Sequence, residues 1–375
     1  MESAAAASPF RSDILRGQVA LLTGGGSGIG FEIATQFGKH GASISIMGRR
    51  SSVVQSAVSS LRSLGIPAVG FQGDVRVVED AERVVESTVK HFGKLDILVN
   101  AAAGNFLASP EDLSPNGFRT VLDIDAVGTF TMCHEAIKYL KRGGPGRGSS
   151  SNNASSSTSD SSSSSSGGLI LNISATLHYT ATFYQIHVAA AKAAVDALTR
   201  NLALEWGTDY EVRVNGIAPG PIGDTTGMRK LVPQEITTKD GGGGRMHRPL
   251  YRVGEKWDIA MAALYLASHA GKHVNGTTMI VDGGLWLSQP RHLPKDAVKQ
   301  LSRTVEKRSR DAPVGIPPPH PTTPNLSDLP NRVTRVDVFH PHALKLFWTG
   351  SPVSGCQSPN SPSSASIISS SNQVL

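Results

Sequence analysis

The sequence has only two cysteines among its 375 residues, Cys133 and Cys356. So few thiols exclude a disulfide framework and a cysteine-based metal site, and they suit a reducing compartment. No run of about eighteen apolar residues is present, so we expect no membrane span. The N-terminus, MESAAAASPFRSD, lacks the basic-then-apolar order of a secretory signal. We therefore expect neither a metal ion nor a membrane to be part of the function.

Hydrophobic residues make up 39% of the chain, which is low for a globular protein of this length. Polar tracts explain the deficit, because they dilute a compact domain. The net charge is +6 and the sequence pI is about 9.3, which would suit a polyanionic partner. However, the basic residues are spread along the chain and are not clustered with aromatic residues, so we expect no nucleic-acid partner. Small ligands that carry phosphate groups would use the same charges.

Short apolar runs alternate with helical patterns from residue 17 to about residue 287. Seven of these runs are typical of strands: QVALL, SISIM, AVGF, LDILV, LILNI, RVNGI and TMIVD. Amphipathic patterns such as GFEIATQFGKHGA lie between them. Right-handed crossovers would place these helices on both faces of a parallel sheet. The sequence therefore predicts an α/β fold, a single Rossmann-type doubly wound domain with a seven-stranded parallel sheet.

Three segments do not follow this alternation. We expect residues 1–14 to form a flexible N-terminus and residues 15–311 to form the folded domain. Within that domain, residues 143–168 contain almost no apolar side chains and are predicted to be a disordered Ser-rich surface insertion. Residues 312–375 are rich in Pro and Ser and are predicted to be a largely disordered tail.

A glycine-rich motif, TGGGSGIG, follows the strand QVALL directly and opens the helix FEIATQF. This position between a strand and a helix makes the motif a strong signature of dinucleotide binding. Glycines let the backbone approach a pyrophosphate, and the helix N-terminus offers free N–H groups and the positive end of its dipole. The residues expected at the pyrophosphate are Thr23, Gly24, Gly25, Gly26, Ser27, Gly28, Ile29 and Gly30.

The end of the second strand predicts which nicotinamide cofactor binds. The run SISIMGRR places Arg49 and Arg50 where an NAD site would carry an acidic residue for the ribose 2′-hydroxyl. An arginine suits a 2′-phosphate, so the sequence favours NADPH. Further cofactor contacts are expected at the carboxyl ends of later strands, where open α/β sheets bind ligands. They are Asp74 and Val75 in GDV, Asn100 and Gly104 in NAAAG, and Pro219, Gly220 and Ile222 in APGPIGDT.

These motifs, together with Ser174 and Lys192, resemble the short-chain dehydrogenase/reductase family in their order and approximate spacing. The resemblance covers roughly residues 15–290 and implies a single Rossmann-type domain that assembles as a homotetramer. The usual catalytic set of that family is Asn, Ser, Tyr and Lys, with the tyrosine four residues before the lysine. Here Val188 stands in place of the tyrosine and Asp125 in place of the asparagine.

These two substitutions, with NAAAGNF and GLWLSQPRHLPKDAVKQLSRTVEKRSR, resemble one branch of the family, the 2,4-dienoyl-CoA reductases of the peroxisomal type. The similarity to plant members extends to about Ile316. The resemblance implies NADPH-dependent reduction of a 2,4-dienoyl-CoA to a 3-enoyl-CoA in the β-oxidation of unsaturated fatty acids. Two alternatives stay open: reduction of an ordinary 2-enoyl-CoA, and NADPH binding without catalysis.

The implied chemistry does not require a tyrosine acid. Hydride adds to the δ-carbon, and charge moves onto the thioester oxygen as a dienolate, which the site must stabilise before a proton reaches the α-carbon. We expect Asp125 to supply the proton through a water polarised between its carboxylate and Lys192, whose ammonium also binds the ribose hydroxyls. Ser174 is expected to hydrogen-bond the thioester carbonyl. Tyr184 and His187 remain as competing acids.

Coenzyme A carries three phosphate groups, so the substrate entrance should hold basic residues. On the resemblance, Arg76 and Arg229 are expected there, while Phe106 and Asn116 are expected to line the acyl side. Enzymes of this branch usually end in a Ser-Lys-Leu peroxisomal address, whereas this chain ends in SSSNQVL. The expected compartment is therefore the peroxisome by resemblance, with the cytoplasm as the alternative.

Overall fold

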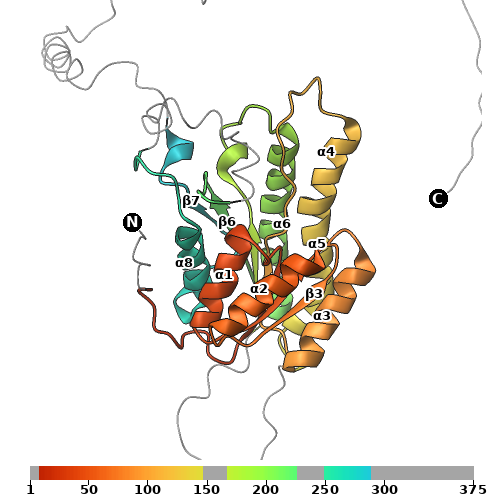
Figure 1. The fold of residues 1–375 in the computed structure, drawn as a ribbon, viewed down its shortest axis with the longest axis vertical. Coiled ribbons are helices and arrows are strands. Elements are labelled where there is room, and N and C mark those ends of the chain that lie inside the picture. Colours follow the sequence, from red (N-terminus) through yellow and green to blue (C-terminus); the bar gives the residue numbers. More distant parts are fainter. Residues whose placement is uncertain (1–7, 147–166, 226–248, 289–375) are drawn as a thin grey trace, which may run out of the picture. The chain divides into compact units, whose positions relative to one another are not determined.

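A computed structural model describes residues 8–146, 167–225 and 249–288. Its seven parallel strands form one sheet in the order β3-β2-β1-β4-β5-β6-β7, which confirms the predicted fold (Figure 1). The strands are β1 (Val19–Thr23), β2 (Ser43–Gly48), β3 (Ala68–Gln72), β4 (Ile97–Asn100), β5 (Leu169–Ile173), β6 (Arg213–Pro219) and β7 (Thr278–Val281). The order reverses between β1 and β4, and ligands of open α/β sheets bind at such a switch point.

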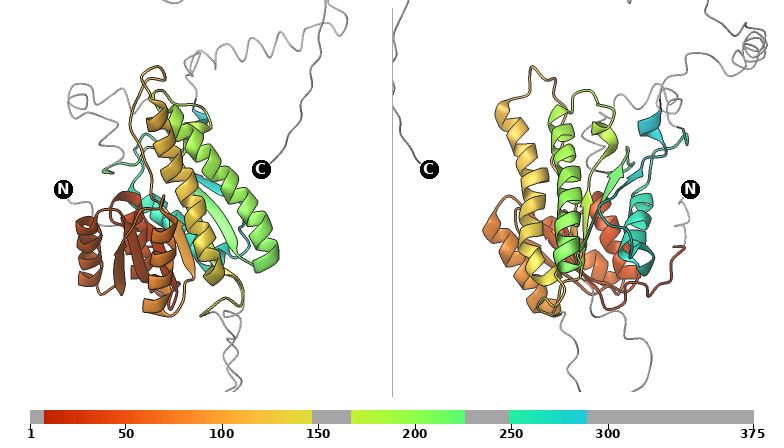
Figure 2. Two further views of the ribbon diagram at one scale, coloured as in Figure 1. Left: turned by 90° about the vertical axis from the view of Figure 1, so that its right-hand side faces the viewer. Right: turned by 180° about the vertical axis from the view of Figure 1, so that it is seen from behind.

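Helices cover both faces of the sheet (Figure 2). They are α1 (Gly28–Lys39), α2 (Ser51–Ser63), α3 (Val78–Phe92), α4 (Pro115–Leu122), α5 (Gly128–Leu140), α6 (Ile186–Tyr210) and α8 (Lys256–Ala267). Shorter helical turns are η1 (Asp123–Val127), η2 (Thr176–His178), η4 (His269–Gly271) and η5 (Leu285–Leu287). Of these, η1 is a π-helical turn that joins α4 to α5, and the two helices run beside α6 (Figures 1 and 2).

Two hydrophobic cores lie on opposite faces of the sheet, because successive side chains of a strand point to opposite sides. Ala20 and Leu22 of β1 contribute to the core under α1, α2 and α8. Leu21 between them contributes to the core under α3, α5 and α6. The five inner strands β1, β2, β4, β5 and β6 are therefore buried on both faces, which explains why they appear as apolar runs in the sequence.

Residues 8–14, which the sequence assigned to a flexible N-terminus, instead contact the folded domain. Ser8 Oγ lies 2.8 Å from His40 Nε2. Phe10 and Ile14 pack against the core beneath α1 and α8. Apolar side chains in this segment therefore anchor it, and the described fold begins at Ser8. Most of the Ser-rich insertion and the whole predicted tail lie outside the described residues.

Candidate functional site

A cavity of about 1060 Å³ opens along the carboxyl ends of the strands. One part is bordered by the glycine-rich turn after β1 and by the ends of β2 and β3. The other part is bordered by residues that follow β4, β5, β6 and β7. Of the residues expected at the cofactor, those on the cavity wall are Gly24, Gly26, Ser27, Gly28, Ile29, Gly30, Arg49, Arg50, Asp74, Val75, Lys192, Pro219, Gly220 and Ile222.

The glycine-rich turn has the shape of a dinucleotide cradle. A Cβ atom on Gly30 would lie 2.7 Å from the Gly24 carbonyl oxygen, and one on Gly24 would lie 2.7 Å from the Ala101 carbonyl oxygen. Gly24 also has a φ of +64°, which glycine adopts without strain. The N-terminus of α1 carries no side-chain cap on Ser27, so its first-turn N–H groups have no side-chain acceptor there. These features fit the pyrophosphate of a nicotinamide dinucleotide.

Two residues of the motif support the turn without lining the cavity. The Thr23 hydroxyl accepts hydrogen bonds from the Ala101 and Ala102 amides, at 3.1 and 3.2 Å, and so ties β1 to the loop after β4. Gly25 lies against Leu22, where a Cβ atom would approach to 3.1 Å. These contacts hold the two loops that border the cavity in register.

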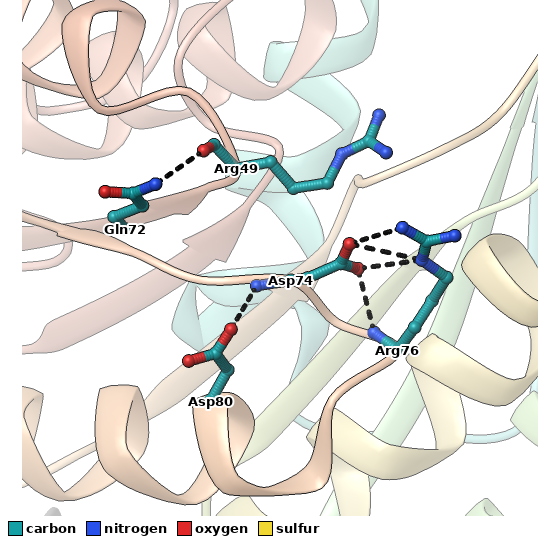
Figure 3. A network of polar contacts seen from close by, with 5 residues as sticks. All are labelled: Arg49, Gln72, Asp74, Arg76 and Asp80. Carbon is teal, nitrogen blue, oxygen red and sulfur yellow. Dashed lines mark hydrogen bonds and ion pairs between the residues drawn. The ribbon is translucent and has the colours of Figure 1, made fainter.

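Arg49 and Arg50 are exposed side chains on the cavity wall at the end of β2. Figure 3 shows the Arg49 side chain extending beside the Asp74–Arg76 pair. Arg76 Nη2 donates to Asp74 Oδ2 at 2.6 Å, and its Nε contacts both carboxylate oxygens. These hydrogen bonds lower the pKa of the Asp74 carboxyl, which therefore stays ionised. Asp74 also accepts the Arg76 backbone N–H, so its carboxylate is already engaged by protein.

Asn100 and Gly104, two residues expected at the cofactor, do not line the cavity. The Asn100 amide donates to Asn172 Oδ1 at 2.9 Å and to Cys133 Sγ at 3.2 Å, inside the core next to α5. The side chain thus has a structural role, because it links β4 to β5. The Gly104 amide donates to Asp125 Oδ1 at 2.7 Å, so the role of this glycine is to position the Asp125 carboxylate.

A buried ion pair lies beside the cavity. Lys192 Nζ is 2.9 Å from Asp125 Oδ2, and the Asp125 side chain has no exposed surface. The ammonium also donates to the Ile173 carbonyl oxygen at 2.9 Å, at the end of β5. Asp125 lies in the π-helical turn η1, a kind of irregularity that is frequent at functional sites. The structure thus brings together the two residues that the sequence assigned to proton delivery.

Ser174, immediately after β5, lines the cavity next to this pair. Its backbone N–H donates to the Ile217 carbonyl oxygen at 2.7 Å, which fixes the main chain. Its hydroxyl is buried and makes no hydrogen bond to any residue that the structure describes. A buried hydroxyl without a protein partner is unfavourable unless a ligand or water binds it. Ser174 can therefore offer an O–H donor to a carbonyl oxygen in the cavity.

Val188 occupies no part of the cavity wall. It is 3% exposed and packs with Val121, Ala191 and the partly buried Phe106 and Leu177. This apolar cluster fills the volume between α4 and the first turns of α6. Position 188, four residues before Lys192, therefore supplies no proton donor. The group that protonates the substrate must lie elsewhere in the site.

The two competing acids lie in different environments. Tyr184 is 55% exposed, and its φ of +63° places it in the left-handed region. His187 is completely buried, and its ring stacks on Phe106 at a centroid distance of 4.2 Å. Burial lowers the pKa of His187, which keeps the imidazole neutral near pH 7. A neutral imidazole is a poor acid, and the Tyr184 phenol is largely exposed.

Of the residues expected to bind substrate, none that is described lies on the cavity wall. Arg76 is held by Asp74. Asn116 is exposed on the first turn of α4, and Phe106 packs against His187 and Val188 behind the wall. Arg229 lies outside the described residues.

Other wall residues were not predicted from the sequence, among them Asn105, Gln185 and Trp286. The Gln185 amide donates to Asn105 Oδ1 at 3.1 Å and so joins the loop before α6 to the loop after β4. Trp286, which follows β7, also lines the cavity. Its position just beyond the carboxyl end of a parallel strand is a signal that could have identified it. Asn105 and Gln185 meet only through the tertiary fold, so no local pattern identifies them.

The geometry supports chemistry on a carbonyl compound next to a bound dinucleotide. Ser174 offers a hydrogen-bond donor, and the Asp125–Lys192 pair can orient a proton source. Within the three described stretches, no group of three or more His, Cys, Asp or Glu side chains could hold a metal ion. None of the described helices is long and apolar enough to cross a membrane.

Comparisons with known proteins agree with this description. A family model named short chain dehydrogenase matches residues 18–236. The chain is 73% identical over 310 residues to the peroxisomal 2,4-dienoyl-CoA reductase, (3E)-enoyl-CoA-producing, of Arabidopsis thaliana, with 83% of this chain and 98% of the relative covered. The mouse protein of the same name is 40% identical over 293 residues, with 78% of this chain and 90% of the relative covered.

A solved structure leads to the same assignment. The crystal structure of a short chain dehydrogenase from Bacillus anthracis is 35% identical and superimposes with a TM-score of 0.60. The match covers 75% of this chain and 100% of the solved chain. The residues that the family model matches, 18–236, contain the glycine-rich turn, strands β1 to β6 and the Asp125–Lys192 pair. The chain belongs to the short-chain dehydrogenase family.

Proposed function

We propose that this protein reduces 2,4-dienoyl-CoA thioesters to 3-enoyl-CoA, in the β-oxidation of unsaturated fatty acids. The observation that carries the proposal is the buried Asp125–Lys192 pair at a site where valine replaces the usual tyrosine. Relatives that are 73% and 40% identical are named for this reaction. The similarity extends through nearly the whole length of the plant relative, which supports a common activity.

The proposed cofactor is NADPH. Arg49 and Arg50 stand exposed on the cavity wall at the end of β2, and each guanidinium can contact a phosphate with two N–H groups. No acidic side chain occupies these two positions to bind a ribose 2′-hydroxyl. When bound, NADPH supplies the hydride. The residues around Pro219 and Gly220 would border its nicotinamide, because they lie on the cavity wall at the carboxyl end of β6.

The chain's own residues then manage charge and protons. As negative charge develops on the thioester oxygen, the Ser174 hydroxyl donates a hydrogen bond to it. The Asp125 carboxylate, oriented by the Gly104 amide, holds a water next to the Lys192 ammonium. That water gives a proton to the α-carbon, which leaves the double bond between carbons 3 and 4. The hydroxide that remains takes a proton from the Lys192 ammonium, which regains one from solvent through the cavity.

Substrate binding follows the same proposal. Arg76 and Arg229 would bind phosphates of coenzyme A, and Phe106 and Asn116 would approach the acyl side. Arg76 already pairs with Asp74, so a phosphate would share its guanidinium with that carboxylate. This sharing is compatible with five N–H donors on one arginine.

The test is an NADPH oxidation assay with a 2,4-dienoyl-CoA and, separately, a 2-enoyl-CoA of the same chain length. We expect turnover of the dienoyl substrate and little of the enoyl substrate. Equal or better turnover of the 2-enoyl-CoA would favour the ordinary enoyl reductase. Nucleotide binding without turnover of either substrate would identify a non-catalytic NADPH-binding protein.

Compartment and assembly are proposed from the relatives. Several of them are named peroxisomal, so we assign this protein to the peroxisome, and imaging with a free native C-terminus tests the assignment. A cytosolic signal would contradict it. We also assign a homotetramer, which sedimentation velocity would reveal as a species of four times the 39.5 kDa chain mass.

A further inference from the structure

His187 is a buried polar side chain that the proposed mechanism does not use. It lies in the first turn of α6, five residues before Lys192, and it has no exposed surface. Neither ring nitrogen makes a hydrogen bond of ordinary geometry to the described residues. A buried nitrogen left without a partner costs about 1–3 kcal/mol, so this arrangement requires an explanation.

The surroundings of His187 place it at the edge of the proton-delivering pair. Its ring stacks on Phe106, at a centroid distance of 4.2 Å and an interplanar angle of 34°. Phe106 is two residues beyond Gly104, whose amide holds Asp125 Oδ1. The Asp125 charge and the Phe106 backbone both favour the protonated ring, although burial outweighs them and lowers the pKa of His187. The helix α6, which carries His187, also packs against the π-helical turn η1, which carries Asp125.

The hydrogen-bonding capacities of the two side chains are complementary. A neutral imidazole has one N–H donor and one nitrogen acceptor. Asp125 Oδ2 forms an ion pair with Lys192 at 2.9 Å but accepts no hydrogen bond of ordinary geometry from the described residues, so it retains a lone pair. A buried water typically makes about three hydrogen bonds to polar groups of this kind.

We propose that His187 is a positioning residue, which holds the proton-delivering water against the Asp125 carboxylate. The imidazole and the carboxylate each hydrogen-bond the water, and Phe106 fixes the ring plane. The role rests on the proposed function, and the reacting proton still leaves from the water. His187 neither gains nor loses a proton in the cycle.

The experiment is a double-mutant cycle on kcat, with NADPH and a 2,4-dienoyl-CoA. The His187→Phe variant keeps the aromatic stack and removes both nitrogens. We expect its kcat to fall by roughly ten- to a hundredfold, with the KM for NADPH unchanged within about threefold. In an Asp125→Asn background the same substitution should change kcat by less than about threefold, because the shared water is already lost. His187→Gln, which keeps a donor and an acceptor, should recover much of the loss.

His134 provides the matched control, because it is exposed on α5 beside Glu135, outside the site. His134→Phe should leave kcat unchanged. A folded His187→Phe variant with kcat within about twofold of the parent would overturn the proposal, and so would equal losses in both backgrounds. If His187→Phe does not fold, His187→Leu is judged by the same two criteria.

A second readout does not depend on turnover. In protein labelled with ¹⁵N-histidine, Asp125→Asn should shift the His187 ring signals, because the shared water links the two side chains. Unshifted signals would reject the positioning role even in an active enzyme. A shift in a protein that fails to reduce dienoyl-CoA would instead uphold the positioning role and reject the proposed substrate.

Discussion

Lys192 Nζ lies 2.9 Å from Asp125 Oδ2 in a region closed to solvent, and each partner is also fixed by main chain. The Gly104 amide holds the carboxylate, and the Ile173 carbonyl oxygen holds the ammonium. The pair therefore connects the loops at the ends of β4 and β5, two central strands of the sheet. Removing one charge from such a buried pair leaves the other uncompensated.

The first prediction concerns the carboxylate. Asp125→Asn keeps the shape of the side chain but removes the charge that polarises the water. We expect kcat with 2,4-dienoyl-CoA to fall at least about a hundredfold, while the dissociation constant of NADPH changes less than about threefold. Stopped-flow kinetics and NADPH fluorescence titration measure the two quantities.

Asp209 supplies the control for this experiment, because it is exposed near the end of α6. Asp209→Asn should leave both quantities unchanged. Near-normal turnover by Asp125→Asn would show that the proton comes from another group. A parallel loss of NADPH binding would instead indicate a collapsed site.

The second prediction concerns the residue that replaces the usual tyrosine. Val188 is packed among Val121, Ala191 and Leu177, so a tyrosine there would overfill the cluster. We expect Val188→Tyr to lower the free energy of unfolding by about 1–3 kcal/mol, measured by urea denaturation. It should not create ketone reduction. A stable variant with new ketone reductase activity would indicate that Val188 reflects only the loss of a catalytic tyrosine and has no packing role.

The fold was predictable from local patterns. The seven apolar runs match the seven strands, because strands buried on both faces leave continuous apolar segments in the sequence. The turn from Thr23 to Gly30 was recognisable because glycines are required where Gly30 approaches Gly24. The meeting of Asp125 and Lys192 came from family resemblance, since no local rule brings a π-helical turn against α6.

Other parts of the site depend on tertiary contacts that local sequence does not encode. Asn100 ends β4, at the expected edge of the sheet, but its side-chain amide turns into the core and donates to Asn172. Asp74 and Arg76 were assigned to different ligands, yet they bond each other. Residues 8–14 are held by contacts with α1 and α8, which are remote in the sequence. The pairing of one side chain with another is therefore what the sequence did not reveal.

The third prediction addresses cofactor choice. Replacing both Arg49 and Arg50 with alanine removes two exposed guanidinium groups from the cavity wall. We expect kcat/KM for NADPH to fall by about ten- to a hundredfold and that for NADH to change little, because only NADPH carries the 2′-phosphate. The loss should shrink at high salt, which screens exposed charges.

Arg16→Ala, at an exposed arginine outside the site, is the control and should leave both ratios unchanged. Equal losses of kcat/KM with NADPH and NADH would indicate that the arginines contact a part of the cofactor that both nucleotides share. A higher kcat/KM for NADH than for NADPH in the parent protein would reject the cofactor assignment outright.

The fourth prediction is a pH dependence of stability. Burial raises the pKa of the Cys133 thiol from 9.0 to about 12, with a small opposing effect of the Asn100 hydrogen bond. The folded state thus retains a proton that the unfolded state loses above pH 9. The protonated Cys133 thiol contributes its full stabilisation of the folded state below pH 9. This contribution to the free energy of unfolding falls by about 1.4 kcal/mol per pH unit as the pH rises from 9 toward 12.

Urea denaturation between pH 8 and pH 11 measures this slope, with Cys133→Ala as the comparison. The variant should be less stable at pH 8, because it loses buried volume, but its stability should decline less steeply above pH 9. Parallel declines would contradict the raised pKa of the thiol.

The most direct test is the product formed from a 2,4-dienoyl-CoA and NADPH by the purified full-length protein. The absorbance of NADPH at its nicotinamide band gives the rate, and NMR of the product gives the position of the remaining double bond. The account predicts one NADPH consumed per substrate and a 3-enoyl-CoA product, with the rate lowered at least about a hundredfold by Asp125→Asn. A 2-enoyl-CoA product, or near-normal turnover by Asp125→Asn, would contradict it.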